Sequence, residues 1–176
     1  SRPTQRPTLT TDISLPEPVK QPLVKKTASS RPLNAPMAPA GRMAYGSNTS
    51  SMIMSGIQSR LGIPYLYGST GPNRYDCSGF VWSVFRDAGI DFERSSARTL
   101  WAASIPVEGD DKYKFGTLVF MNGLGHMGIV ADENGFYHAS SSKGITYSPF
   151  AGYWSSRIVG FRKLNPEGSV SQQEAK

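Results

Sequence analysis

The sequence predicts an α+β domain in which helices come first and an antiparallel sheet follows. Apolar residues recur at helical spacing between residues 47 and 103, whereas short β-rich runs follow Gly109. Most gaps between these runs contain Gly, Asn or Asp, which favour tight turns and therefore an antiparallel meander. We therefore expect N-terminal helices packed on one antiparallel β-sheet.

Three helices are expected before the sheet. In the first, over residues 47–61, Ile53, Ile57 and Leu61 share one face. Its candidate N-caps are Ser47, Thr49 and Ser50. The second begins after the N-cap Asp76 and ends at Gly89, with an apolar stripe between them. A third short helix is expected over residues 96–103, and strands are expected over 117–121, 126–131, 135–139, 144–147 and 158–164.

Charge and proline divide the chain into three parts. Residues 1–46 carry +5 of the net charge of +6, and residues 1–40 hold eight of the 13 prolines. This composition predicts an extended, disordered arm over residues 1–44, with a folded domain over 45–164 and a polar tail over 165–176. The arm is a plain linker or a tether to an anionic wall polymer or membrane surface. The nearly neutral body has no basic stripe with interleaved aromatics, which argues against nucleic acid.

Several classes of protein are excluded by simple counts. The single cysteine permits no internal disulfide and none of the usual structural zinc sites. No apolar stretch approaches the about 18 residues that span a bilayer. The chain begins at Ser1 with no apolar signal core, so we expect any targeting peptide to be absent already.

The single cysteine, Cys77, is expected at or next to the first position of the second helix. The free N–H groups and partial positive charge of a helix N-terminus favour thiolate, so its pKa is expected to fall. A nucleophilic thiol needs a nearby base and a third group that orients the base. The chain offers two imidazoles for these roles, His126 and His138.

Both histidines lie on predicted strands that a turn near Asn134–Gly135 connects. In such a hairpin the numbers of paired residues add to roughly 266, which makes His126 and His138 diagonal neighbours. Their side chains are expected on one face of the sheet, and that face would receive the N-terminus of the Cys77 helix. Inert core roles for these residues stay open, as does a metal site of Asp76, Cys77, His126 and His138, which no short ligand spacing supports.

Five motifs, in order over about residues 50–164, resemble those of the NlpC family of papain-like cysteine peptidases. They are GIPYLYG at 62–68, YDCSGFV at 75–81, RSS at 94–96, GHMGIV at 125–130 and FYHAS at 136–140. The departures are Ser69 for a usual glycine, Tyr75 for a smaller residue and Thr117 for a usual aspartate. None removes a catalytic group, but Ser69 and Tyr75 put the shape of the substrate subsites in question.

The resemblance implies a papain-like fold and assigns a role to each site residue. Cys77 would be the nucleophile, His126 the base and His138 the group that orients it. Tyr65 would donate its hydroxyl to the oxyanion. The residues that would contact substrate are Asp76, Ser78, Arg94 and Ser95. From the residues alone, Asp76 is equally a helix cap, and Arg94 equally an ion-pair partner of Asp91 or Glu93.

The resemblance also implies the activity. The family cleaves peptidoglycan stem peptides, mostly between γ-D-glutamyl and the diamino acid, without a cofactor or metal. An extracytoplasmic location and a monomer are expected. The alternatives are a related papain-like thiol amidase or acyltransferase, and a non-catalytic wall-binding module. The order of Cys77 before His126 argues against the circularly permuted acyltransferases.

Overall fold

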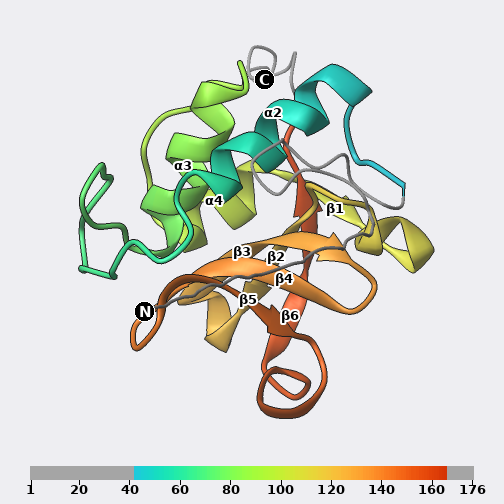
Figure 1. Cartoon of the computed structure of the whole chain (residues 1–176). Coiled ribbons are helices and arrows are strands. Elements are labelled where there is room, and N and C mark those ends of the chain that lie inside the picture. The colour runs from blue at the N-terminus through green and yellow to red at the C-terminus, as the bar shows by residue number, and fades with distance from the viewer. Residues whose placement is uncertain (1–41, 166–176) are drawn as a thin grey trace, which may run out of the picture. The chain divides into compact units, whose positions relative to one another are not determined.

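The computed structural model describes residues 42–165, so nearly all of the expected arm and tail lies outside the described residues. The helices are α2 (Ser47–Gln58), α3 (Cys77–Asp87) and α4 (Ala97–Ala103). The strands are β1 (Ile105–Val107), β2 (Leu118–Met121), β3 (His126–Asp132), β4 (Gly135–Ser140), β5 (Gly144–Pro149) and β6 (Ile158–Lys163). Short 3₁₀ helices η3 (Gly109–Tyr113), η4 (Asn122–Leu124) and η5 (Gly152–Trp154) lie between strands. The helices and the sheet form separate layers, which confirms the α+β prediction (Figure 1).

The six strands form one sheet in the order β1-β6-β2-β3-β4-β5, and all neighbours are antiparallel. The predicted meander is confirmed for β2 to β5. It is wrong for β6, because the segment after β5 crosses over and pairs β6 with β2. This pairing places Phe161 opposite Val119, and both side chains are buried. Strand β1, which has only three residues, was not expected from the sequence.

The helix boundaries show which local signals decide them. Asp76 caps α3 as predicted, and Gly89 follows its end with a φ of 88° that favours glycine. Ser96 caps α4 through a bond from the Thr99 backbone N–H. The predicted N-caps of α2 are wrong: Gly46 occupies that position. The Ser50 hydroxyl instead donates to the carbonyl of Tyr45 at 3.2 Å.

Two apolar clusters fill the two faces of the sheet. The first joins α2 and α3 to the sheet through residues such as Ile57, Phe80, Leu118 and Ile129. The second, on the opposite face, comprises Val119, Met121, Val130, Phe136 and Phe161. Between residues 42 and 165, no helix combines the length and apolar character needed to cross a membrane.

Candidate active site

The thiol of Cys77 lies on the first residue of α3, as the sequence predicts. The Asp76 carboxylate accepts from Gly79 N–H at 2.7 Å and from Gly68 N–H at 2.8 Å, which fixes the entry into the helix. A Cβ at Gly79 would overlap the carbonyl oxygen of Ser69, so this turn requires glycine. Cys77 is 9% exposed and therefore keeps a small contact with solvent.

Burial raises the pKa of the Cys77 thiol, and the neighbouring Asp76 carboxylate adds to the rise. Backbone groups of Met127, Ser78 and Cys77 itself act in the opposite direction. The prediction of a lowered pKa is therefore wrong, because desolvation of the thiolate outweighs the N–H groups of the helix terminus. The sulfur carries its proton at neutral pH and needs a base to lose it.

The two histidines are hydrogen bonded to each other and form a chain with a serine. His126 Nε2 lies 2.8 Å from His138 Nδ1, and His138 Nε2 lies 2.8 Å from Ser148 Oγ. Burial lowers the pKa of His126 to about 4 and that of His138 to about 3. Both imidazoles are therefore neutral at pH 7. The two hydrogen bonds use Nε2 of His126 and both ring nitrogens of His138, and do not use Nδ1 of His126.

The register of the β3–β4 hairpin produces this pair as predicted. Ile129 lies opposite Tyr137, and the numbers of the pair add to 266. The same register makes His126 and His138 diagonal neighbours. Residue 128, in line with His138, is glycine, and a Cβ there would lie 2.6 Å from the Tyr137 carbonyl and 3.1 Å from the His138 Cβ. Glycine thus lets the two strands approach at the imidazole pair.

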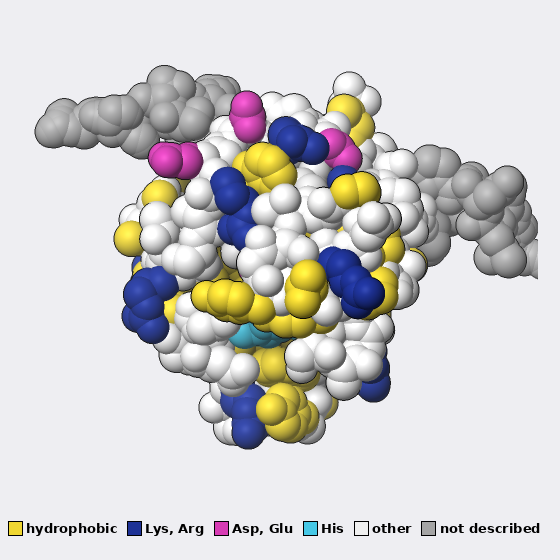
Figure 2. Space-filling view, turned by 90° about the vertical axis from the view of Figure 1, so that its left-hand side faces the viewer, with side chains coloured by type: hydrophobic (Ala, Val, Ile, Leu, Met, Phe, Trp, Pro, Cys, Tyr) yellow, Lys and Arg dark blue, Asp and Glu magenta, His cyan; other side chains and the backbone are white. Residues whose placement is uncertain are grey.

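The histidines lie on the face of the sheet opposite the one that the body of α3 covers. His138 contacts Phe136 of the second cluster, with ring centroids 4.7 Å apart, whereas α3 packs on the first cluster. Cys77 instead approaches the first residues of β3, where its Sγ lies 4.0 Å from the Gly125 carbonyl oxygen. The sulfur therefore lies beside the residue that precedes His126, at the start of β3. Figure 2 shows histidine at the bottom of a hollow flanked by hydrophobic side chains.

Trp154 of η5 covers the imidazole pair and was not found from the sequence. Its ring stacks on His126 with centroids 5.4 Å apart and an interplanar angle of 13°. It also makes an edge-to-face contact with His138, with ring centroids 5.4 Å apart. A stacked indole keeps water from the imidazole face and disfavours the imidazolium. Trp154 therefore contributes to the burial that lowers the pKa values of His126 and His138.

Replacing Trp154 with alanine is expected to raise the pKa of His126 from about 4 toward its usual 6.5, since water regains access to the ring. The check is a pH titration of the histidine resonances by NMR. Tyr153→Ala is the matched control, because Tyr153 is the exposed neighbour in η5. Equal His126 pKa values in the wild type and the Trp154 variant would contradict this account.

Tyr65 lies on the loop that runs beside the segment preceding Cys77. The Leu66 N–H donates to the Tyr75 carbonyl at 3.1 Å, and the Tyr75 N–H donates to the Pro64 carbonyl at 3.1 Å, which ties the two segments together. Burial raises the pKa of Tyr65, and the charges of the Cys77 thiolate, which forms only at high pH, and of the Asp76 carboxylate add to the rise. Its hydroxyl therefore remains a hydrogen-bond donor near the sulfur.

The four residues expected to contact substrate form one network. Arg94 Nη2 lies 3.0 Å from Asp76 Oδ1, and its Nη1 donates to Ser78 Oγ at 2.9 Å and to the Ser95 carbonyl at 2.6 Å. The ion pair of Arg94 is thus with Asp76, not with Asp91 or Glu93. The guanidinium braces the helix cap next to the nucleophile.

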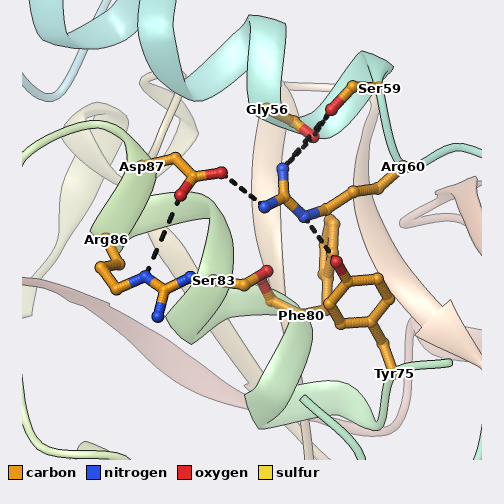
Figure 3. Close-up of polar contacts among 8 residues, drawn as sticks. All are labelled: Gly56, Ser59, Arg60, Tyr75, Phe80, Ser83, Arg86 and Asp87. Carbon is orange, nitrogen blue, oxygen red and sulfur yellow. Dashed lines mark hydrogen bonds and ion pairs between the residues drawn. The ribbon is translucent and has the colours of Figure 1, made fainter. Parts of the chain in front are cut away.

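A second arginine, Arg60, bonds to Tyr75 in the segment that precedes Cys77 (Figure 3). It is buried between α2 and α3, where its Nη2 lies 2.6 Å from Asp87 Oδ2. Its Nε donates to the Tyr75 hydroxyl at 3.0 Å, and its Nη1 donates to the Gly56 carbonyl at 2.8 Å. Arg60 therefore joins the two helices to the segment that leads into Cys77.

Arg60→Met is expected to lower the free energy of unfolding by about 2 kcal/mol, because the buried Tyr75 hydroxyl and Gly56 carbonyl lose their donor and the half-exposed Asp87 loses its ion-pair partner. Urea denaturation followed by circular dichroism measures the change. Arg86→Met is the control, since Arg86 approaches the same Asp87 only at 4.0 Å and is half exposed. A loss from Arg60→Met no larger than that from the control would contradict a bracing role.

The local sequence contains little that could have identified Trp154, Ser148 or Arg60. Each acts across a long-range contact that depends on how strands and helices pack. For Ser148 the available signal was its place directly after the expected strand 144–147, which follows the strand of His138. The alternative metal site gains no support, because residues 42–165 contain no group of three or more His, Cys, Asp or Glu side chains that could hold an ion.

Comparisons with known proteins show which proteins the chain resembles. The chain is 35% identical over 113 residues to "Gamma-DL-glutamyl hydrolase" of Bacillus subtilis, covering 60% of this chain and 27% of that protein. It is 30% identical over 142 residues to "Probable peptidoglycan endopeptidase LytE" of the same species, covering 78% of this chain and 41% of that protein. The chain thus spans less than half the length of these relatives.

A solved structure shares the fold. It is an NLP/P60 family protein of Staphylococcus aureus described as similar to lipoprotein, with a TM-score of 0.61 and 27% identity over 71% of this chain and 44% of that one. The profile of the NlpC/P60 family matches residues 62–163, which include the cysteine, both histidines and Tyr65. That match spans more than half of the chain, which therefore belongs to the NlpC/P60 family.

Proposed function

We propose that the chain is a cysteine endopeptidase that hydrolyses peptidoglycan stem peptides between γ-D-glutamyl and the diamino acid. The observation that carries the proposal is the His126–His138 hydrogen bond, which occupies Nε2 of His126 and so leaves Nδ1 as the nitrogen that can take a proton from the thiol. The names of the relatives support the substrate class. This activity places the protein outside the cytoplasm, at the cell envelope or secreted.

In the proposed mechanism, Nδ1 of His126 takes the proton of Cys77 as the sulfur attacks the scissile carbonyl. The resulting tetrahedral oxyanion accepts from the Cys77 backbone N–H and from the Tyr65 hydroxyl. His126 then gives its proton to the leaving amine, and the C–N bond breaks. Water attacks the thioester with His126 again as base, which releases the acid and restores the thiol.

Because both partners are neutral at rest, proton transfer accompanies attack. The raised pKa of Cys77 and the lowered pKa of His126 both disfavour a standing thiolate–imidazolium pair. His138 accepts from Nε2–H of His126 and stabilises the imidazolium when it forms. The hydroxyl of Ser78 and the guanidinium of Arg94, with Asp76 and Ser95, form the proposed wall against the substrate.

The remaining proposals concern the whole protein. Residues 1–44 are proposed to tether the domain, as a linker or through their positive charge to an anionic wall or membrane surface. The domain is proposed to act as a monomer on peptidoglycan peptides.

The test is digestion of purified muropeptides by the wild type and by Cys77→Ala, with products identified by mass spectrometry. We expect a cut after γ-D-glutamyl in the wild type and none in the variant. A cut between the sugar and L-Ala would indicate an amidase instead. Wall binding without any cleavage would indicate the non-catalytic module.

Tyr65→Phe is expected to lower kcat about 100- to 1000-fold with little change in KM, since the hydroxyl bonds most strongly to the transition-state oxyanion. Steady-state cleavage of a soluble muropeptide measures both constants. Tyr67→Phe is the matched control, because Tyr67 lies on the same loop and is 86% exposed. Similar kcat values for the two variants would remove Tyr65 from the oxyanion site.

A further inference from the structure

We propose that Ser148 is a positioning residue whose hydroxyl accepts the Nε2 proton of His138. In doing so it selects the tautomer of both imidazoles, so that His126 presents an unprotonated Nδ1 to Cys77. The inference deepens the proposed function and rests on His126 being the base of that reaction. Ser148 itself lies one imidazole away from the base.

The arrangement spans three adjacent strands. His138 on β4 has Thr146 of β5 as its direct cross-strand partner, and Ser148 is the next residue along the same face of β5. His126 on β3 is the diagonal neighbour on the other side. His138 thus bonds to one group on each flanking strand, both at 2.8 Å.

The chain of bonds can hold its protons in two ways. In one, His126 donates Nε2–H to His138 Nδ1, and His138 donates Nε2–H to Ser148; Nδ1 of His126 is then a free base. In the other, Ser148 donates to His138 Nε2, His138 donates Nδ1–H to His126, and Nδ1 of His126 carries a proton. Only the first arrangement lets His126 accept the proton of the thiol.

The surroundings of His138 make Ser148 decisive for the first arrangement. His138 is 2% exposed, and its other close neighbours include the rings of Phe136 and Trp154, which offer no strong acceptor. Without the hydroxyl, the first arrangement leaves a buried N–H unpaired, whereas the second leaves only a ring lone pair. Orphaned buried N–H groups are the rarer and costlier case, so loss of the hydroxyl shifts the pair toward the inactive tautomer.

The experiment uses ¹⁵N-labelled histidine in the full chain. Because the chain has only two histidines, the spectrum contains two imidazoles, which His138→Gln assigns. The variants are Ser148→Ala, Ser148→Thr and Ser148→Val. Threonine keeps a hydroxyl, and valine has the shape of threonine without the hydroxyl. Thr146→Val is the control, since the Thr146 hydroxyl points to the Tyr147 carbonyl at 3.5 Å.

In Ser148→Ala and Ser148→Val we expect part of the population to carry a proton on Nδ1 of His126. We expect kcat to fall about 10- to 100-fold in both variants, with KM within about twofold of the wild type. Ser148→Thr restores both readouts, and Thr146→Val leaves both unchanged. A wild-type tautomer in Ser148→Ala overturns the proposal, even if kcat falls. If Ser148→Ala does not fold, the Thr and Val variants decide by the same criterion.

The two proposals fail differently. A tautomer shift in a protein whose wild type cleaves no muropeptide would support the role of Ser148 and overturn the peptidase assignment. Full cleavage by the wild type with no shift in either hydroxyl-free variant would overturn only the role of Ser148.

Discussion

His126→Ala is expected to lower kcat for muropeptide cleavage about 10⁴-fold, while the domain remains folded. The reason is the state of the thiol: burial keeps Cys77 protonated, so without a base the sulfur is a poor nucleophile. Single-turnover cleavage followed by chromatography measures the loss, and circular dichroism monitors the fold.

The matched comparison is His138→Gln, whose side-chain oxygen can still accept from Nε2–H of His126. Its expected loss is about 10- to 100-fold, since only the orientation and stabilisation of the imidazolium suffer. A larger loss for His138→Gln than for His126→Ala would exchange the roles of the two histidines. A Cys77→Ala, His126→Ala double variant should be no worse than either single one, because the two groups act as a unit.

Acid is expected to destabilise the fold strongly, through the same two histidines. Their folded pKa values, about 4 and about 3, lie below the usual 6.5, so the unfolded chain binds more protons between these limits. The free energy of unfolding is therefore highest above pH 6.5 and decreases as the pH falls toward the folded pKa values of about 4 for His126 and about 3 for His138. At pH 4 each histidine accounts for a loss of about 3 kcal/mol relative to neutral pH.

Urea denaturation between pH 7.5 and 4 measures this slope. The control is the His126→Gln, His138→Gln double variant, which contains no histidine and keeps only the contribution of the carboxylates. The difference between the two slopes isolates the imidazoles. Parallel curves for the wild type and the double variant would show that these rings are not buried in neutral form.

The local parts of this domain were predictable. Asp76 as N-cap and Gly89 as helix stop follow from the backbone preferences of those residue types. The register of the β3–β4 hairpin follows from its turn, and it places His126 and His138 diagonally. The counts of one cysteine and two histidines already pointed to Cys77, His126 and His138, and the resemblance assigned their roles because the motifs that carry them are short and contiguous.

The missed features depend on contacts between distant segments. Strand β6 does not pair with β5, which it follows in the sequence, but with β2. Trp154 reaches the imidazoles because η5 lies in the crossover segment between β5 and β6. The net effect on the Cys77 pKa depends on how much water the packed site excludes, which a helix N-terminus alone does not determine. Arg60 looks like a surface residue in the sequence, yet it lies buried between two helices.

The positions of the groups along the chain have a kinetic consequence. His126, His138 and Ser148 lie on successive strands joined by short turns, whereas Cys77 comes from a helix far upstream. Contacts between near neighbours form sooner than those that close long loops. We therefore expect the two imidazoles and Ser148 to come together before the helix of Cys77 packs on the sheet. A newly made chain would then become active only when this helix packs.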